Sequence, residues 1–137
     1  MEQESIFELL HTMDQVTNKL IIQWNRTFNE NLGISHILVL SHLNEHGKSR
    51  PSDIAKALGL TPPSLTHLSE KLINKKLAVR LADENDRRIL YLDLTKLGYE
   101  MLRKAYKEGQ QLRKQLFEKL TAEERKQLLA IYEKLNS

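Results

Sequence analysis

The sequence contains no cysteine, and only 3 prolines and 5 glycines occur among its 137 residues. Without cysteine the chain forms no disulfide, offers no thiolate ligand to a metal and carries no thiol-based redox sensor. No apolar run approaches the roughly 20 residues of a membrane-spanning helix, and the N-terminus lacks the basic start of a secretory signal. We therefore expect a cytoplasmic protein that does not bind a membrane.

What the sequence does contain is long segments rich in Leu, Glu, Lys and Gln, which favour helices. The length fits one domain with a hydrophobic core. The net charge of +3 is concentrated between Lys48 and Arg88, where nine basic and five acidic residues leave +4. Because the rest of the chain sums to about −1, this segment is the best suited to bind a polyanion.

Residues 51–58 and about 62–75 predict two helices joined by a tight turn. Ala55 is small enough to let the helices approach, Gly59 allows the positive φ of a turn, and Leu65 fills the space between them. The second helix begins after Thr61, whose hydroxyl is a suitable cap, and has proline in its first turn. This arrangement predicts a helix-turn-helix.

The second of these helices separates into two faces on a helical wheel. The inner face is expected to consist of Leu65, Leu68, Ser69, Leu72 and Ile73, and the outer face of Pro63, Thr66, His67, Glu70, Lys71 and Asn74. The outer face is small or polar at first and basic further along, which suits a helix in the major groove of DNA. A solvated helix surface is the alternative interpretation.

After Leu77 the apolar period changes from 3.6 to 2, which predicts two strands at residues 77–82 and 89–94. Alternation in the second strand places Leu90, Leu92 and Leu94 on one buried face. The polar tip between the strands ends in Arg87 and Arg88, and arginine suits a narrow minor groove. Asp86 beside them is expected to orient a guanidinium by a forked hydrogen bond. A solvated hairpin tip is the alternative.

Four further helices are expected outside this region. They run over about 4–31, over 35–46 with Ser35 as cap and Gly47 as stop, from Thr95 to about Leu120, and onward from a capping box at Thr121–Glu124. In the second of them, Ile34, Ile37, Leu38 and Leu43 are expected to face inward. The other three carry more apolar surface than a small winged domain can cover, which predicts association with a second copy.

In order and spacing these elements resemble the MarR (multiple-antibiotic-resistance regulator) family of bacterial transcription factors. The resemblance spans nearly the whole chain and rests on Pro51-Ser-Asp-Ile-Ala55 with Leu58-Gly-Leu60, on Leu65-Thr66, on Asp86-Arg-Arg88 and on Leu94-Thr95-x-x-Gly98. It implies a mainly α fold with a small β-hairpin wing in a single domain, 1–137. Within that domain it implies a winged helix-turn-helix at about 34–94 and dimerisation helices at about 4–31 and 95–136.

The resemblance also implies a homodimer that binds a pseudo-palindromic operator in double-stranded DNA, usually as a repressor, and that a small-molecule effector releases. By position it assigns Pro63, Ser64, Thr66, His67 and Lys71 to the groove-facing helix, and Asp86 and Arg88 to the wing motif. From their chemistry, Lys71, Arg87 and Arg88 are expected to supply salt-dependent affinity, and Thr66 and His67 base preference.

Three residues depart from the family pattern. His67 stands where arginine is common, which alters the expected base readout. Lys76 stands where glycine is usual, and a lysine there is expected to strain the end of the helix. Arg50 stands where a hydroxyl cap is common, and we interpret it as a candidate phosphate contact.

The sequence also contains features that are typical of other functions. His42-Leu-Asn-Glu45-His46 matches the H-x-x-E-H motif of inverzincin peptidases, but its helix is short and no remote carboxylate ligand is evident. No other enzyme signature occurs, so we expect no enzymatic activity, no cofactor and no metal centre. A metal-responsive regulator using His11, His36, His42 or His46, and a winged helix used only for protein contacts, remain as alternatives. Trp24 and Phe28 are candidates to line an effector pocket, although aromatic residues at helical spacing usually belong to the core.

Overall fold

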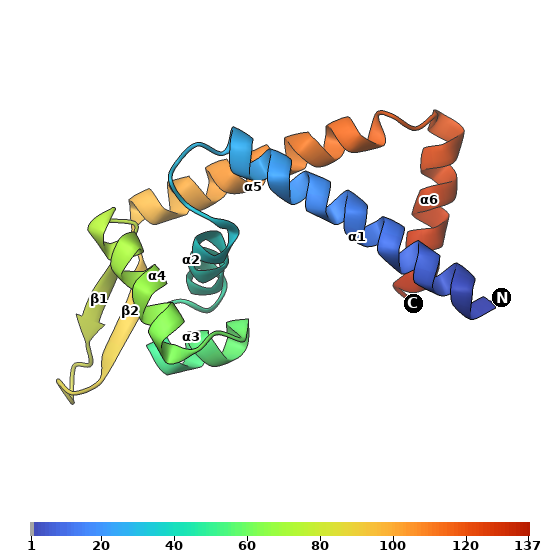
Figure 1. The fold of residues 1–137 in the computed structure, drawn as a ribbon. Helices are drawn as coiled ribbons and strands as arrows, with labels where there is room; N and C mark the ends of the chain where they lie inside the picture. The colour runs from blue at the N-terminus through green and yellow to red at the C-terminus, as the bar shows by residue number, and fades with distance from the viewer. Residues whose placement is uncertain (1) are drawn as a thin grey trace. The chain divides into compact units, whose positions relative to one another are not determined.

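The computed structural model describes residues 2–137, with side chains from residue 5 onward (Figure 1). Its elements are α1 (Glu2–Thr27), α2 (Ile34–His46), α3 (Pro51–Leu58), α4 (Pro62–Asn74), β1 (Ala78–Ala82), β2 (Leu90–Leu94), α5 (Lys96–Phe117) and α6 (Ala122–Leu135). The two strands form one antiparallel hairpin, with Ala78 opposite Leu94 and Ala82 opposite Leu90. The predicted mainly helical fold with a small β-hairpin is confirmed.

The chain divides into two compact units. The first, which we call the winged unit, is Phe28–Tyr106 and holds α2, α3, α4 and the hairpin. The second, which we call the terminal unit, combines Met1–Thr27 with Lys107–Ser137. Helix α5 runs through both, since the boundary falls between Tyr106 and Lys107.

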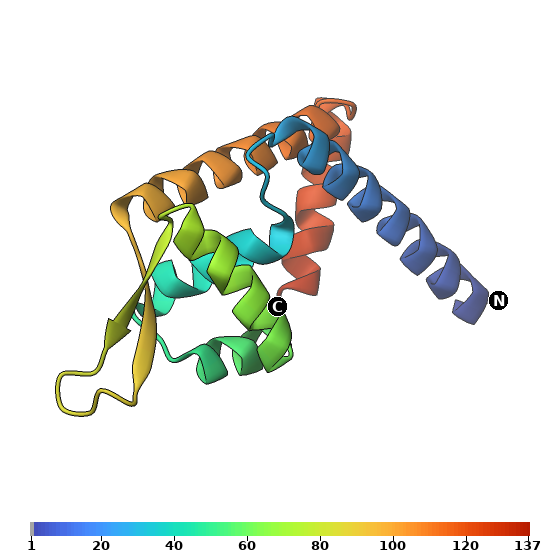
Figure 2. The same cartoon turned by 60° about the vertical axis from the view of Figure 1, so that its left-hand side comes forward.

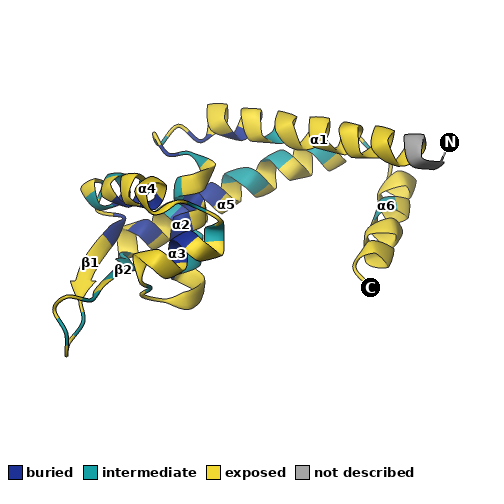
Figure 3. Cartoon of the chain, turned by 60° about the horizontal axis from the view of Figure 1, so that its bottom comes forward, coloured by how far each residue is buried: buried dark blue, intermediate teal, exposed yellow. Residues whose placement is uncertain are grey.

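The core of the winged unit lies around α2, which contacts α3, α4 and β2. Its most deeply buried side chains are Val39, Leu40, Leu43, Ile54, Leu65, Leu72, Leu77 and Leu102. Figure 3 shows the buried residues gathered in this part of the chain, whereas α1 and α6 are mostly exposed. Burying apolar area of this kind is the main force that holds the unit together.

The predicted buried face of α2 is only half right, and its predicted cap was wrong. Ile37 and Leu43 are buried as predicted, but Ile34 and Leu38 are exposed. Val39 and Leu40 are fully buried instead, because contacts on several sides bury more than one stripe of the helix. The helix also begins at Ile34, so Gly33 and not Ser35 is its N-cap residue. The Gly33 N–H donates to Nδ1 of His36 at 3.0 Å, and this side chain supplies the capping interaction.

The helix-turn-helix has the predicted bounds to within one residue. Gly59 adopts a left-handed conformation with φ of 66°, and the N–H of Leu60 donates to the Ala55 carbonyl at 2.8 Å. Thr61 caps α4, since its hydroxyl oxygen accepts the N–H of Ser64 at 3.2 Å. The turn and the cap are therefore both confirmed.

The two ends of the hairpin are joined where α4 ends and α5 begins. The Thr95 hydroxyl donates to the Lys76 carbonyl at 2.7 Å, and the Thr95 N–H donates to the Leu77 carbonyl at 3.2 Å. A Cβ added at Gly98 would lie 2.0 Å from the Leu77 carbonyl oxygen, so only glycine fits this contact. We call this contact set, formed by Lys76, Leu77, Thr95 and Gly98, the hairpin clamp.

Helix α1 ends at Thr27 and not near residue 31 as predicted. Phe28 and Leu32 lie in the connecting segment, yet both are buried. The apolar spacing that suggested a longer helix therefore continues into a non-helical segment that contributes to the core. Helix α5 likewise ends at Phe117, before the predicted Leu120.

The terminal unit exposes many large apolar side chains. On α1 these are Ile6, Phe7, Leu9, Leu10, Met13, Val16, Ile21 and Ile22, and on α6 Leu129, Ile131, Tyr132 and Leu135. Its capping box is confirmed, since Glu124 N–H donates to Thr121 Oγ1 and Thr121 N–H donates to Glu124 Oε1. Across residues 2–137, no helix has the length and apolar character needed to cross a membrane.

Candidate nucleic-acid interface

Helix α4 has one buried face and one exposed face, divided as predicted. Leu65, Ser69 and Leu72 are buried, and the residues of the predicted outer face are exposed except for the half-buried Lys71. Figures 1 and 2 show the hairpin projecting beside this helix. A polar helix face next to a hairpin is the geometry with which winged domains meet a major groove and its flank.

Two hydroxyls on this helix already make intramolecular hydrogen bonds. Thr66 donates to the Pro62 carbonyl at 3.0 Å, and Ser64 Oγ accepts from the Thr61 hydroxyl at 2.8 Å. Thr66 is therefore available to a base edge as an acceptor, whereas Ser64 keeps its own proton to donate. His67, which is exposed, offers either function according to its tautomer.

An open depression of about 490 Å³ adjoins the same face. It is lined by Ser35, Leu60, Pro63, Ser64, His67 and Leu68. Three of the residues assigned to the groove-facing helix line it, namely Pro63, Ser64 and His67. The depression therefore adjoins the surface that the sequence analysis predicted to face the major groove.

Lys71 is held at the base of the outer face. Its ammonium donates to Asn31 Oδ1 at 3.2 Å, so it bonds the segment between α1 and α2 to α4. Burial lowers the pKa of nearby His36, and the positive charges of Lys71, His67 and Lys75 lower it further. His36 on α2 thus lies near His67 and Lys71 on α4 and near Lys75 at its C-cap. An ammonium has three donors, so Lys71 can keep Asn31 and bind a phosphate as well.

The predicted forked hydrogen bond at the wing tip is present. The Asp86 carboxylate accepts from Nε and Nη2 of Arg88 at 3.1 and 3.2 Å, and also from the Arg88 N–H at 3.0 Å. These bonds lower the pKa of Asp86, and those from the guanidinium contribute more than the one from the backbone N–H. The Arg88 side chain is 91% exposed, and it is thus oriented while open to solvent.

Asp83 organises the rest of the tip, which the sequence analysis missed. Its Oδ2 accepts the N–H groups of Asn85 and Asp86 at 3.0 and 3.1 Å, and its Oδ1 accepts the Tyr91 hydroxyl at 3.1 Å. The Asn85 and Tyr91 bonds are the main reasons that the pKa of Asp83 is lowered, and the pKa of Tyr91 is raised by the same contact. Asp at the start of a polar tip commonly forms a turn by accepting backbone N–H groups. This tendency was the sequence signal from which the role of Asp83 could have been predicted.

The remaining predicted site residues lie apart from one another. Arg50 is the exposed N-cap residue of α3, where its side chain makes no capping hydrogen bond. Arg87 is exposed at the wing tip. Trp24 in the terminal unit and Phe28 in the winged unit are both buried, which favours a core role over an effector contact.

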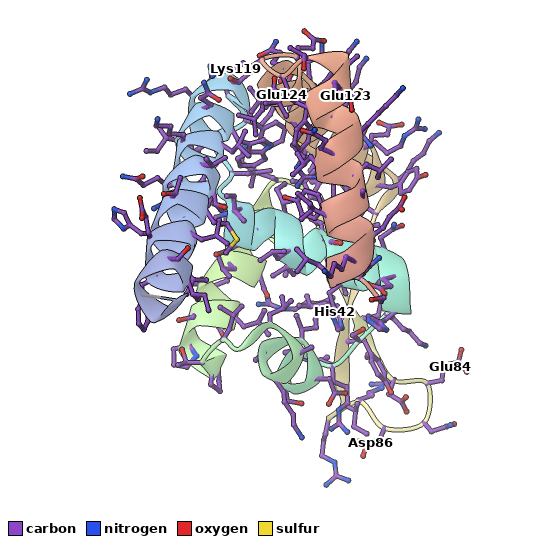
Figure 4. All side chains as sticks on the ribbon, turned by 90° about the vertical axis from the view of Figure 1, so that its right-hand side faces the viewer. His42, Glu84, Asp86, Lys119, Glu123 and Glu124 are labelled. Carbon is purple, nitrogen blue, oxygen red and sulfur yellow. The ribbon has the colours of Figure 1, made fainter. Side chains whose placement is uncertain are left out.

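The H-x-x-E-H motif brings its two histidines together on α2. His42 and His46 have ring centroids 4.4 Å apart on α2, and the pKa of His42 is lowered by burial and by His46. Figure 4 shows His42 well away from Glu84 and Asp86 at the wing tip. Among the described side chains, no three His, Asp or Glu residues lie close enough to hold a metal ion. The H-x-x-E-H spacing thus lacks the third ligand that a zinc peptidase needs.

A helix-turn-helix followed by a hairpin with an arginine at its tip defines a winged helix-turn-helix protein. Comparison with known proteins agrees, since the model of the MarR family matches residues 32–90. The uncharacterized HTH-type transcriptional regulator YwhA of Bacillus subtilis is 34% identical over 97 residues, which cover 71% of this chain and 70% of YwhA.

The transcriptional repressor MprA of Escherichia coli is 33% identical over 100 residues, covering 73% of this chain and 57% of MprA. Among solved structures, the YusO protein from Bacillus subtilis has a TM-score of 0.81 at 22% identity, and the match covers 99% of this chain and 97% of YusO. The chain therefore belongs to the MarR family of winged helix-turn-helix transcriptional regulators. Its relatives are regulators and not enzymes, as the sequence analysis expected.

Proposed function

We propose that this chain is a cytoplasmic, homodimeric repressor that binds a pseudo-palindromic operator and is released by a small-molecule effector. The observation that carries the proposal is the pairing of an exposed polar face on α4 with an oriented arginine, Arg88, on the adjacent wing. In this arrangement α4 reads the major groove and the wing binds the flanking minor groove.

Thr66 and His67 supply most of the base preference, with Pro63 and Ser64 permitting close approach of the helix. Lys71, Arg87, Arg88 and Arg50 supply attraction to phosphates or to the minor groove. Support for repression comes from the name of the relative MprA, a transcriptional repressor. Support for a homodimer comes from the exposed apolar side chains of α1 and α6, since large exposed apolar patches mark contact surfaces.

The experiment that tests this function is fluorescence anisotropy with the duplex upstream of the protein's own gene and with a scrambled duplex, across a salt series. We expect tight binding to one duplex and weak binding to the other, with both affinities falling steeply as salt rises. Equal binding to both duplexes would contradict sequence specificity at that site and would call for selection from random DNA. Absence of binding to either duplex at low salt would favour a winged helix used for protein contacts.

The variant Arg88→Ala adds a second test with a matched control. We expect it to weaken binding and to reduce the slope of log affinity against log salt by about 0.9. Arg103→Ala removes the same charge from α5 of the winged unit and is expected to leave affinity within about twofold. Unchanged affinity in Arg88→Ala would overturn the role of the wing.

A further inference from the structure

We propose that Asp83 and Tyr91 are positioning residues that hold Arg88 ready for DNA, through a continuous series of contacts from the body of the winged unit to the wing tip. The proposal rests on the proposed function, because it assumes that Arg88 binds DNA. It adds two residues that do not themselves contact the nucleic acid.

The last contact in the series is the one between Asp86 and Arg88. A free arginine side chain at a hairpin tip samples many rotamers, and fixing them costs free energy on binding. Two hydrogen bonds from the Arg88 guanidinium to the Asp86 carboxylate restrict that sampling before DNA arrives. A third, from the Arg88 backbone N–H, fixes the backbone between the two residues. The orientation of Arg88 then depends on how firmly Asp86 itself is held.

Asp86 is held by the backbone of the tip. Its N–H donates to Asp83 Oδ2, and its carbonyl accepts the N–H of Ile89 at 3.0 Å. The Asp83 N–H donates to the Ile89 carbonyl at 2.9 Å and closes the tip. Asp83 is therefore the residue whose carboxylate sets the course of the chain that leads to Asp86.

Tyr91 connects Asp83 to the body of the winged unit. Its hydroxyl donates to Asp83 Oδ1, and the ammonium of Lys48 lies 5.1 Å from the centroid of its ring. The next residue, Leu92, is buried and exchanges two backbone hydrogen bonds with Ser49, at 2.9 and 2.8 Å. The strand that carries Tyr91 is thereby fixed to the segment between α2 and α3.

The negative charges at the wing tip distinguish a positioning role from a general effect of surface charge on DNA binding. A carboxylate near DNA phosphates weakens binding by repulsion, so acids at a DNA-binding tip need another reason to be there. Each oxygen of Asp83 accepts at least one hydrogen bond. Glu84 is exposed on the same tip and takes no part in these bonds, and Figure 4 shows its side chain directed outward. Glu84 is therefore the matched control.

The test measures operator affinity by anisotropy for Tyr91→Phe, Asp83→Asn and Glu84→Gln, each alone and combined with Arg88→Ala. Tyr91→Phe keeps the ring under Lys48 and removes only the hydroxyl, and we expect about fivefold weaker binding, as for one lost hydrogen bond. Asp83→Asn is expected to weaken binding further, although it removes a negative charge. Glu84→Gln is expected to leave binding unchanged or slightly tighter.

The decisive readout is the coupling to Arg88. In the Arg88→Ala background, Tyr91→Phe is expected to change affinity by less than about twofold, because the side chain that it positions is gone. An equal loss in both backgrounds would overturn positioning in favour of a general structural role. An Asp83→Asn variant that behaves like Glu84→Gln would overturn it as well.

Two controls separate this proposal from the proposed function. Thermal unfolding identifies a variant that fails to fold, and Tyr91→Phe then carries the test. If Arg88→Ala weakens binding while Tyr91→Phe does not, the wing binds DNA and only the positioning role is wrong. If the unaltered protein binds no duplex, both proposals are overturned.

Discussion

Lys76 is a lysine in the left-handed region, with φ of 63°, directly after the C-cap of α4. That conformation costs a non-glycine residue roughly 1–2 kcal/mol. We therefore expect Lys76→Gly to raise the free energy of unfolding by about 1 kcal/mol, measured by urea denaturation. Lys75→Gly is the control, because Lys75 has φ of −84° and gains nothing from glycine. Equal effects of the two variants would show that Lys76 is not strained.

The lowered pKa of His36 predicts how the free energy of unfolding depends on pH. Burial comes first, and the charges of Lys71, His67 and Lys75 follow, in lowering its pKa below the ordinary 6.5. The unfolded chain therefore binds a proton that the folded chain resists, so stability falls as the pH drops below about 6.5. Within the described part of the chain, its Nε2 is buried without a hydrogen-bond partner, so no acceptor offsets this effect.

We expect His36→Gln to reduce the pH dependence of unfolding between about pH 5 and 7, measured by urea denaturation at each pH. His42, whose pKa is also lowered, supplies part of the slope that remains. His11→Gln, at an exposed position on α1, is the control and should leave the slope unchanged. A slope unchanged in His36→Gln would assign the dependence to another group.

Contacts between residues close in sequence were predictable, whereas those that depend on tertiary placement were not. Asp86 and Arg88 are two residues apart, so the chemistry of the pair was enough to predict their hydrogen bond. The Asp83–Tyr91 bond crosses the hairpin and depends on its register. The Lys71–Asn31 bond joins segments 40 residues apart, and no local pattern signals it.

At the scale of single elements, proline, glycine and capping residues were the reliable signals of where a helix begins and ends. Pro51, Gly59 and the Thr61-Pro62 pair gave the bounds of α3 and α4 because each restricts the backbone directly. The buried face of α2 was mispredicted because periodicity shows that an apolar stripe exists but not how many neighbours cover the helix. The end of α1 was mispredicted because Phe28 and Leu32 are buried outside any helix.

Helix α3 lacks a side-chain cap, since Arg50 occupies that position. Arg50→Ser supplies an acceptor for the first turn, and we expect it to raise the free energy of unfolding by about 1 kcal/mol. If Arg50 binds a phosphate, the same variant weakens DNA binding and lowers the salt slope by about 0.9. Denaturation and a salt series measure the two effects separately.

Arg50→Ala is the matched control for this exchange. It removes the cation without adding a cap, so we expect the same loss of DNA affinity and no gain in stability. If both variants keep the slope of log affinity against log salt of the unaltered protein, Arg50 binds no phosphate.

At the scale of the whole molecule, the terminal unit predicts association. Leu129 on α6 is 59% exposed, within a run that includes Ile131 and Tyr132. We expect the protein to sediment as a dimer, and Leu129→Glu to raise the dimer dissociation constant at least tenfold, about 1.4 kcal/mol. Glu133→Lys changes an exposed polar residue of the same helix and is expected to leave the dimer intact. A monomer in the unaltered protein would contradict the homodimer.

The order of the elements and the fold class could be predicted because each depends on local patterns and on a family resemblance. The position of the boundary between Tyr106 and Lys107 could not, since α5 is continuous across it and no break in composition marks it. The assignment of residues 1–137 to a single MarR-type domain stays a prediction.

The hairpin clamp has a consequence for how such a chain can diversify. The clamp holds the two ends of the wing together through Lys76, Leu77, Thr95 and Gly98. The hairpin between them therefore begins and ends at fixed positions. A longer, shorter or differently charged tip can be exchanged there without moving the end of α4 or the start of α5. Under the proposed function, changes confined to the tip would alter the preference for flanking DNA while α4 stays in place.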